Sequence, residues 1–193
     1  MEMTKYEHGT PSWIDLGTPD LEGAIAFYSG LLGWDVEIGP PEMGRYSMAT
    51  LRGKNVAGLA DQQQPGPVWW SSYVSVDDID DVLARVEKAG GTVAMPAMEI
   101  PEAGRMAVTQ DIGGAFISFW EPAAHIGAEL VNEPGTLCWN ELATRAVDES
   151  LAYYADVLGW TAVSIGDGAY YELHRGDAPI GGLLPLVGEM AAS

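Results

Sequence analysis

Two stretches of the sequence are copies of one another, and this repetition limits the possible fold more than any other feature. Residues 12–34 read SWIDLGTPDLEGAIAFYSGLLGW, and residues 138–160 read CWNELATRAVDESLAYYADVLGW. At a constant offset of 126 positions (139 minus 13), the identical pairs are Trp13/Trp139, Leu16/Leu142, Thr18/Thr144, Ala26/Ala152, Tyr28/Tyr154, Leu32/Leu158, Gly33/Gly159 and Trp34/Trp160. Repetition at a fixed offset indicates that the chain folds as copies of one supersecondary unit.

The local pattern of the first stretch predicts a strand followed by a helix. The strand predicted at SWIDLGT ends at Thr18-Pro19, where threonine can cap a helix and proline can occupy its first position. Apolar side chains then recur at helical spacing, and Gly33 is expected to end the helix. These apolar positions are Leu21, Ile25, Tyr28 and Leu32. Three short strands are predicted next, in WDVEIG, RYSMATLRG and NVAGLA.

A weaker copy of the same unit lies between the two strong ones. The strand-like WWSSYVSVDD leads into DIDDVLARVEKAGG, where Asp78-Ile79 matches Asp20-Leu21 at an offset of 58 (78 minus 20). Its three strands are predicted in TVAMPAMEI, GRMAVTQDIGG and AFISFWEP, and the last copy ends with WTAVSI, YYELHRG and APIGGLLPL. The sequence therefore predicts an α+β fold of three tandem βαβββ modules, named here the first (about 11–64), second (68–122) and third (136–186) segments.

These repeats resemble the vicinal oxygen chelate superfamily, which comprises glyoxalases, bleomycin-resistance proteins and dioxygenases. The resemblance is carried by Asp20-Leu21, Ala26-Phe27-Tyr28, Leu32-Gly33-Trp34, Tyr153-Tyr154, Leu158-Gly159-Trp160 and the stretch AGRMAVTQDIGGAFISFWEP. More narrowly, HGTPSWIDLGT and HIGAELVNEPGTLCWNEL are similar to a bacterial two-domain subgroup of glyoxalase-like proteins and natural-product hydroxylases, which usually carries four modules. The resemblance implies that paired modules form a curled mixed sheet around a cleft.

The resemblance also suggests a division into domains. We predict an N-terminal extension (1–10), a two-module glyoxalase-like domain (11–122), a linker (123–135), a half-domain formed by the third segment (136–186) and a tail (187–193). An unpaired module exposes a sheet face, and such a face is unstable alone or binds a partner. We therefore expect either a truncated chain or a homo-oligomer in which third modules pair between chains.

Enzymes of the superfamily typically bind one divalent metal through His and Glu of the first and last strands of paired modules. The corresponding positions in this sequence are Trp13, about Gly58, Ser71, Ser118, Trp139 and about Gly182. None is a usual metal ligand. Of the three histidines, His8 and His125 are expected to be solvated or capping residues, whereas His174 lies on a predicted strand and could face the cleft. We expect no metal and no other cofactor.

The residues expected to line the cleft follow from strand alternation, which places residues two apart on one face. Trp13 then shares a face with Asp15, and Trp139 shares one with Glu141. A carboxylate among aromatic groups would have a raised pKa, so Asp15 and Glu141 are candidate general acids or bases. The alternative is that both carboxylates only bind neighbouring groups or lie at a module interface. The predicted ligand-binding residues are Trp13, Met48, Trp70, Ser71, Tyr73, Met106, Ser118, Trp120, Trp139 and His174.

Composition limits the possible partners. The chain has 9 basic and 28 acidic residues and a formal charge of −19, so its field would repel nucleic acid and anionic membranes. It has no apolar run long enough to span a membrane and no secretory signal pattern, and its single cysteine fits a reducing compartment. We predict a cytoplasmic protein whose partner is a small molecule, with no nucleic-acid or membrane partner.

Three functions remain open from the sequence. An aromatic cleft without metal ligands favours a protein that binds a small aromatic or apolar molecule without a metal. The subgroup resemblance instead favours an enzyme, glyoxalase-like or a hydroxylase or isomerase of a natural product, with Asp15 or Glu141 as acid or base. The leftover third module would also suit a non-catalytic interaction subunit.

Overall fold

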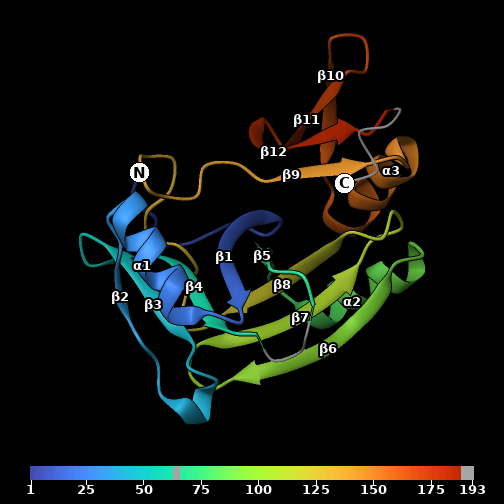
Figure 1. The fold of residues 1–193 in the computed structure, drawn as a ribbon. Coiled ribbons are helices and arrows are strands. Elements are labelled where there is room, and N and C mark those ends of the chain that lie inside the picture. The colour runs from blue at the N-terminus through green and yellow to red at the C-terminus, as the bar shows by residue number, and fades with distance from the viewer. Residues whose placement is uncertain (63–65, 188–193) are drawn as a thin grey trace. The chain divides into compact units, whose positions relative to one another are not determined.

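The structure is a computed structural model of the chain and describes residues 1–62 and 66–187. Each of its three α-helices is preceded by one strand and followed by three, and the strands form two mixed sheets (Figure 1). The predicted α+β class is therefore confirmed, whereas the pairing of modules around a cleft stays a prediction. Apart from Val187, the predicted tail lies outside the described residues.

The chain divides into two compact units that do not follow the order of the sequence. Unit 1 contains Met1–Tyr6, Ser12–Tyr73 and Ile126–Cys138. Unit 2 contains Glu7–Pro11, Val74–His125 and the chain from Trp139 onward. The boundary between the units cuts through β1 (Thr10–Thr18), whose first two residues belong to unit 2, and through β5 (Trp69–Ser75), whose first five residues belong to unit 1.

Unit 1 is a sheet with one helix against it. Its elements are β1 (Thr10–Thr18), α1 (Leu21–Leu32), β2 (Asp35–Glu37), the short 3-10 helix η1 (Pro41–Met43), β3 (Ser47–Leu51) and β4 (Lys54–Asp61). The strand order is β2-β3-β4-β1-β5, with β1 parallel to β4 and β3 antiparallel to both of its neighbours. Helix α1 lies against one face of this sheet (Figure 1), where Leu16, Leu21, Trp34 and Leu59 are buried together.

Both ends of α1 are set by single residues. Gly33 ends the helix in the left-handed conformation (φ 74°), as predicted. The predicted cap at Thr18 is wrong, because the helix begins at Leu21 and the residue before it is Asp20. The Asp20 carboxylate accepts the N–H of Gly23 at 2.9 Å, while the Thr18 hydroxyl accepts the N–H of Asp20 at 3.2 Å.

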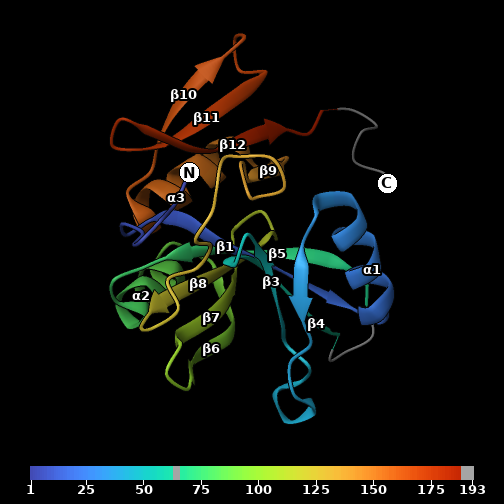
Figure 2. The same ribbon diagram turned by 90° about the vertical axis from the view of Figure 1, so that its left-hand side faces the viewer.

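Unit 2 holds the other two helices. Its elements after β5 are α2 (Ile79–Lys88), β6 (Thr92–Ile100), β7 (Gly104–Gln110), β8 (Phe116–Pro122), β9 (Glu141–Thr144), α3 (Val147–Leu158), β10 (Thr161–Ile165), β11 (Tyr170–Arg175) and β12 (Ala178–Pro185). Strands β8, β7 and β6 are antiparallel, and β10-β11-β12-β9 form a separate sheet in which β12 is parallel to β9 (Figure 2).

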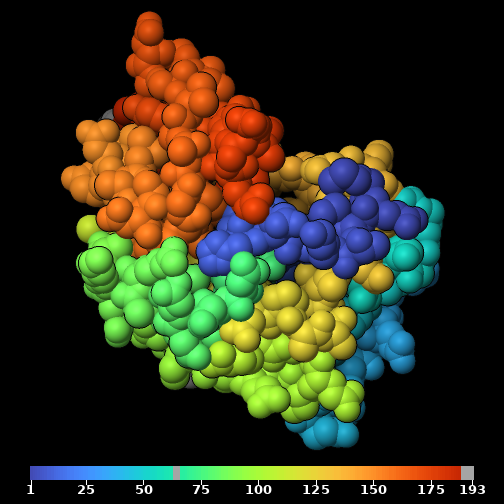
Figure 3. Space-filling view, turned by 180° about the vertical axis from the view of Figure 1, so that it is seen from behind, coloured from blue at the N-terminus to red at the C-terminus, as the bar shows by residue number. Residues whose placement is uncertain are grey.

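The core of unit 2 lies between its helices and sheets. Helices α2 and α3 pack against one another, and their surfaces, green and orange, meet in Figure 3. Val82 and Val86 of α2 are fully buried in one cluster with Tyr153 and Val157 of α3 and with Phe119 of β8. Phe119 of β8 and Leu173 of β11 therefore point into this core, and the residues that alternate with them along each strand point to the opposite sheet face. No helix among the described residues is long and apolar enough to cross a membrane.

Candidate functional site

A hydrogen-bonded cluster in unit 1 surrounds the carboxyl group of Asp15. The indole N–H of Trp13 donates to Tyr46 Oη at 2.8 Å, and the Tyr46 hydroxyl donates to Asp15 Oδ2 at 3.2 Å. The Tyr73 hydroxyl donates to the same Oδ2 atom at 2.8 Å, and Ser71 also bonds the carboxyl group through its side chain. Trp13, Asp15, Tyr46, Ser71 and Tyr73 are named the Asp15 cluster.

Three strands position these side chains on the sheet face that α1 does not cover. Trp13 and Asp15 alternate along β1 with Ile14 and Leu16, which pack into the core against α1. Tyr46 immediately precedes β3, and β5 supplies Ser71 and Tyr73. The cluster is therefore built from β1, from its sheet neighbour β5 and from the residue that precedes β3, a strand separated from β1 by β4.

The electrostatics of the cluster favour a protonated carboxyl group. Burial raises the pKa of Asp15 above its ordinary value of 3.8, and the hydrogen bonds from Tyr73, Ser71 and Tyr46 offset only part of that rise. Burial also raises the pKa of Tyr46 well above 10.0, and the nearby Asp15 charge adds to this effect. Burial therefore makes both the Asp15 carboxyl group and the Tyr46 phenol hold a proton more firmly than they would in water.

Gly58 provides the space that Tyr46 occupies. It lies directly opposite Asp15 in the parallel pairing of β1 with β4. A Cβ atom at position 58 would lie 2.2 Å from Tyr46 Oη and 3.1 Å from Asp15 Cβ. The Tyr46 hydroxyl thus fills the volume that a longer side chain at position 58 would need.

The residues at this place do not fit a divalent metal ion. The first-strand and last-strand positions at which the superfamily typically carries ligands are Trp13 and Gly58, which offer no imidazole or carboxylate donor. Throughout residues 1–62 and 66–187, no group of three or more His, Cys, Asp or Glu is arranged to hold a metal ion. Asp15 is the one carboxylate of the cluster.

Two further predicted residues of the first and second segments are placed differently. Met48 lies opposite Gly58 in the pairing of β3 with β4 and is partly buried. Trp70 donates its indole N–H to Tyr28 Oη at 3.1 Å and packs edge-on against the same ring, with centroids 5.2 Å apart. Trp70 is therefore a residue of the α1-facing core and does not join Trp13, because it alternates along β5 with Ser71.

The predicted residues of β7 and β8 share a face in unit 2. Met106 lies opposite Trp120 in the antiparallel register, and Ser118 lies two residues before Trp120. The alternate residues Ala107 and Phe119 are buried in the core instead. The Trp120 indole N–H donates to the carbonyl oxygen of His125 at 2.8 Å, so its polar edge is already bonded.

The third segment repeats the arrangement of the Asp15 cluster. Trp139 donates its indole N–H to Tyr170 Oη at 2.9 Å, and the Tyr170 hydroxyl donates to the Glu141 side chain. Gly182 lies opposite Glu141 in the pairing of β12 with β9, and a Cβ atom there would lie 1.6 Å from Tyr170 Oη. These four residues, Trp139, Glu141, Tyr170 and Gly182, are named the Glu141 cluster.

His174 and Glu172 lie on the same strand as Tyr170. His174 Nε2 and Glu172 Oε1 are 2.7 Å apart, and Glu172 lies opposite Gly182. Of Tyr170, Glu172 and His174, the sequence predicted only His174 as a ligand-binding residue. Sequence reasoning missed Tyr46 and Tyr170, although their spacing repeats. Tyr46 precedes Gly58 by 12 residues (58 minus 46), and Tyr170 precedes Gly182 by the same number (182 minus 170).

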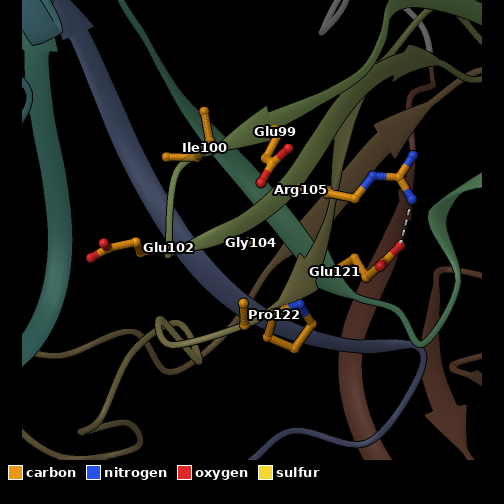
Figure 4. A pocket seen from close by; sticks show the side chains of 8 residues that line it. Glu99, Ile100, Glu102, Gly104, Arg105, Glu121 and Pro122 are labelled. Carbon is orange, nitrogen blue, oxygen red and sulfur yellow. Dashed lines mark hydrogen bonds and ion pairs between the residues drawn. The ribbon is translucent and has the colours of Figure 1, made fainter.

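A separate hollow of about 310 Å³ lies in unit 2 near the turn between β6 and β7 (Figure 4). Its lining residues are Glu99, Ile100, Glu102, Gly104, Arg105, Glu121, Pro122 and Ala123. Arg105 forms an ion pair with Glu121 at 3.2 Å and another with Asp80 at 3.0 Å. None of the residues predicted for the site lines this hollow.

Each helix follows one strand and precedes three, and the first strand is parallel to the last in the first and third segments. The chain belongs to the Glyoxalase/Bleomycin resistance protein/Dioxygenase superfamily, whose family model matches residues 10–119. The resemblance to this superfamily inferred from the repeats is thereby confirmed.

Individual relatives are similar along nearly the whole chain. A Mycobacterium tuberculosis protein named "Putative glyoxylase CFP32" is 44% identical over 191 residues, covering 94% of this chain and 73% of the relative. The anthracycline biosynthesis protein DnrV of Streptomyces peucetius is 35% identical over 202 residues, covering 95% of this chain and 74% of the relative.

Solved structures share the fold at low sequence identity. The Mn(II)-bound glyoxalase from Novosphingobium aromaticivorans has a TM-score of 0.69 at 17% identity, and the similarity covers 93% of this chain and 62% of that one. The 2,3-dioxygenase LapB from Pseudomonas sp. KL28 has a TM-score of 0.65 at 16% identity, covering 95% and 73%. This likeness concerns the fold alone.

Proposed function

We propose that the chain consists of three βαβββ modules and that the Asp15 cluster binds a small, flat, largely aromatic molecule without a metal ion. The observation that carries the proposal is the Asp15 carboxyl group, partly buried and bonded by the hydroxyls of Tyr46, Ser71 and Tyr73. A protonated carboxyl group in this place can donate a hydrogen bond to a carbonyl or phenol oxygen of a ligand. The metal-dependent alternative lacks donors, because the ligand positions carry Trp13 and Gly58.

The aromatic character of the ligand is supported by the site and by one relative. Trp13, Tyr46 and Tyr73 place three aromatic rings around a single acid, a composition that suits a flat ligand with one polar edge. The relative DnrV is named for anthracycline biosynthesis, and a polycyclic aromatic natural product is consistent with these rings. Of the other residues predicted to bind ligand, Met48 lies opposite Gly58 and can add a thioether contact.

A second candidate function is catalysis, with Asp15 as general acid or base. The raised pKa of Asp15 favours this role, since a carboxyl group that titrates nearer neutrality transfers protons more effectively. Glu141 is the other acid predicted for catalysis, but it is exposed on β9. The substrate would be a natural product of the same aromatic class, and the reaction would be of the glyoxalase, hydroxylase or isomerase type.

Isothermal titration with alizarin, a flat hydroxylated anthraquinone, tests the proposal. We expect saturable binding that persists after dialysis against EDTA and is unchanged by added Mn²⁺. Asp15→Ala should weaken binding by about tenfold, which corresponds to the loss of one hydrogen bond between the acid and the ligand. The matched control Asp35→Ala removes an exposed carboxylate of β2 and should bind like the unmodified protein.

The outcomes separate the two functions. Binding without change of the ligand, weakened in Asp15→Ala, supports a binding protein. Chromatography measures conversion of the ligand. Conversion that is lost in Asp15→Asn while binding is retained supports the enzyme. A requirement for Mn²⁺ or Fe²⁺ in binding would contradict the metal-free site.

A further inference from the structure

The Asp15 cluster is covered at one end along β1 and open at the other. Trp13, two residues before Asp15, is only 4% exposed, and its indole N–H is bonded to Tyr46. Gly17, two residues after Asp15, lies on the same face of the strand. Apart from its chain neighbours, an added Cβ at Gly17 would meet no heavy atom of the described residues within 4 Å. A ligand bonded to Asp15 therefore has room to extend toward Gly17, whereas packed atoms cover Trp13.

Small residues form the sheet surface at the open end. Gly17 lies opposite Ala60 in the parallel pairing of β1 with β4, as Asp15 lies opposite Gly58. At Gly58 the Tyr46 hydroxyl fills the space above the backbone, but the space above Gly17 is open. Ala60 adds a single methyl group beside it. The sheet is therefore nearly bare next to the acid, which suits a flat ring lying on it.

The first residues of β5 lie beside this open end. Gly9, just before β1, donates its backbone N–H to the carbonyl oxygen of Ser75 at the end of β5, so these neighbouring strands run antiparallel. Gln62 joins the other ends of the two strands. Its backbone N–H donates to the Thr18 carbonyl oxygen at 2.9 Å, and its side chain donates to the Pro67 carbonyl oxygen at 3.2 Å. The start of β5 is therefore next to the end of β1.

Trp69 is the first residue of β5 and carries an exposed indole ring at this place. It alternates along the strand with Trp70, which packs into the α1-facing core, so Trp69 shares the opposite face with Ser71 of the Asp15 cluster. Its side chain is 53% exposed. A large aromatic ring is stabilised when its surface is removed from water, and a flat ligand stacked against it provides that cover.

We propose that Gly17 and Trp69 make the site selective for ligands of several fused rings. The polar edge of the ligand bonds Asp15, and its remaining rings lie over Gly17 and against the indole ring of Trp69. This inference rests on the proposed binding at the Asp15 cluster. Two residues of an extended strand span about 6–7 Å, so a single ring bonded at Asp15 stops short of these two residues, whereas fused rings reach them. Gly17 and Trp69 thus determine specificity for the length of the ligand.

Isothermal titration of the full chain with two ligands tests the role of Gly17. Alizarin has three fused rings, and catechol has one ring with the same pair of adjacent hydroxyl groups. Gly17→Val should weaken alizarin binding by about tenfold, because its methyl groups occupy the space of the outer rings, and should change catechol binding by less than about twofold. The Gly17 backbone is not left-handed and valine suits a strand, so urea unfolding should show no loss of stability. Equal weakening of both ligands would overturn the proposal.

A second pair of variants tests the stacking on Trp69. Trp69→Ala should weaken alizarin binding by about fivefold, and Trp69→Phe, which keeps a ring, should weaken it less. The matched control Phe27→Ala removes an exposed ring from α1, which covers the other face of the sheet, and should bind alizarin like the unmodified chain. In ¹H–¹⁵N spectra, the indole signal that is missing from Trp69→Phe should shift on addition of alizarin and hardly shift with catechol.

The outcomes separate this inference from the proposed function. Alizarin affinity that is unchanged in both Gly17→Val and Trp69→Ala, together with weakened binding in Asp15→Ala, would overturn the inference and leave binding at Asp15 intact. An unmodified chain that binds neither alizarin nor catechol would contradict the proposed function, and the inference would be overturned with it.

Discussion

At the scale of single residues, hydrogen bonds on two sides fix the orientation of the Tyr46 hydroxyl. It accepts the Trp13 indole N–H and donates to Asp15, and the absence of a side chain at Gly58 leaves it room. A phenol that accepts a hydrogen bond on one side and donates one on the other has a single hydroxyl orientation. The same three relations recur in the Glu141 cluster.

Gly58→Ala should destabilise the folded chain by about 1–3 kcal/mol, because the added methyl group overlaps the Tyr46 hydroxyl. The matched control is Gly17→Ala on the same face of β1, where an added Cβ meets nothing within 4 Å. That variant should be neutral or slightly stabilising. Urea unfolding measures both, and similar losses in the two variants would contradict the tight fit at Gly58.

Asp15 should make stability depend on pH with a defined sign. Burial raises its folded-state pKa above 3.8, so its stabilising contribution is full below the unfolded pKa and is lost as pH rises through the folded pKa. Asp15→Asn removes this dependence. The unfolding free energy of Asp15→Asn minus that of the unmodified chain should therefore be more positive at about pH 7 than at about pH 4.5.

Urea unfolding at the two pH values measures this difference, with Asp35→Asn as the exposed control. All other titrating groups are shared between the variant and the unmodified chain, so their contributions cancel. A difference that becomes more negative as pH rises would mean that the pKa of Asp15 is lowered in the folded state.

At the scale of elements, helix α2 depends on one capping residue. The Asp78 carboxylate accepts the backbone N–H groups of Asp80 and Asp81, each at 3.0 Å. Asp78→Ala should cost about 1 kcal/mol of unfolding free energy, because two helix donors lose their partner. Asp77→Ala removes the same charge next to the helix without removing the cap, and it should cost clearly less. Equal losses in urea unfolding would assign the effect to charge instead of capping.

Much of the element order could be predicted because the sequence repeats it. The strand-helix-three-strand order and the end of α1 at Gly33 follow from local signals such as apolar spacing and glycine, and the structure has them. The start of α1 was misplaced, because Thr18 and Asp20 are both capable caps and only the backbone path selects between them.

The candidate site was only partly predictable for a different reason. Alternation along β1 was sufficient to place Trp13 and Asp15 together, since both lie on one strand. Tyr46 reaches Asp15 only because β3 pairs with β4 and β4 pairs with β1, and local patterns do not specify these pairings. Trp70 was assigned to the wrong face because the sequence alone did not show which face of β5 meets α1.

At the scale of the whole molecule, the formal charge of −19 sets a general repulsion within the folded chain. Only 9 basic residues are available to balance 28 acidic ones, so the folded state brings like charges closer than the unfolded chain does. Dissolved salt screens such charges over a distance that shrinks from about 30 Å at 0.01 M to about 10 Å at 0.1 M.

The urea midpoint should therefore rise as NaCl increases from about 0.01 M to about 0.3 M at pH 7. At about pH 4.5, where many carboxyl groups carry a proton, the same increase in salt should have a much smaller effect. Both series use one protein and one salt, so the pH comparison removes any effect of NaCl that does not depend on charge. A midpoint that rises equally at the two pH values would mean that salt acts through burial of apolar surface, and that the repulsion among the acidic residues has little influence on stability.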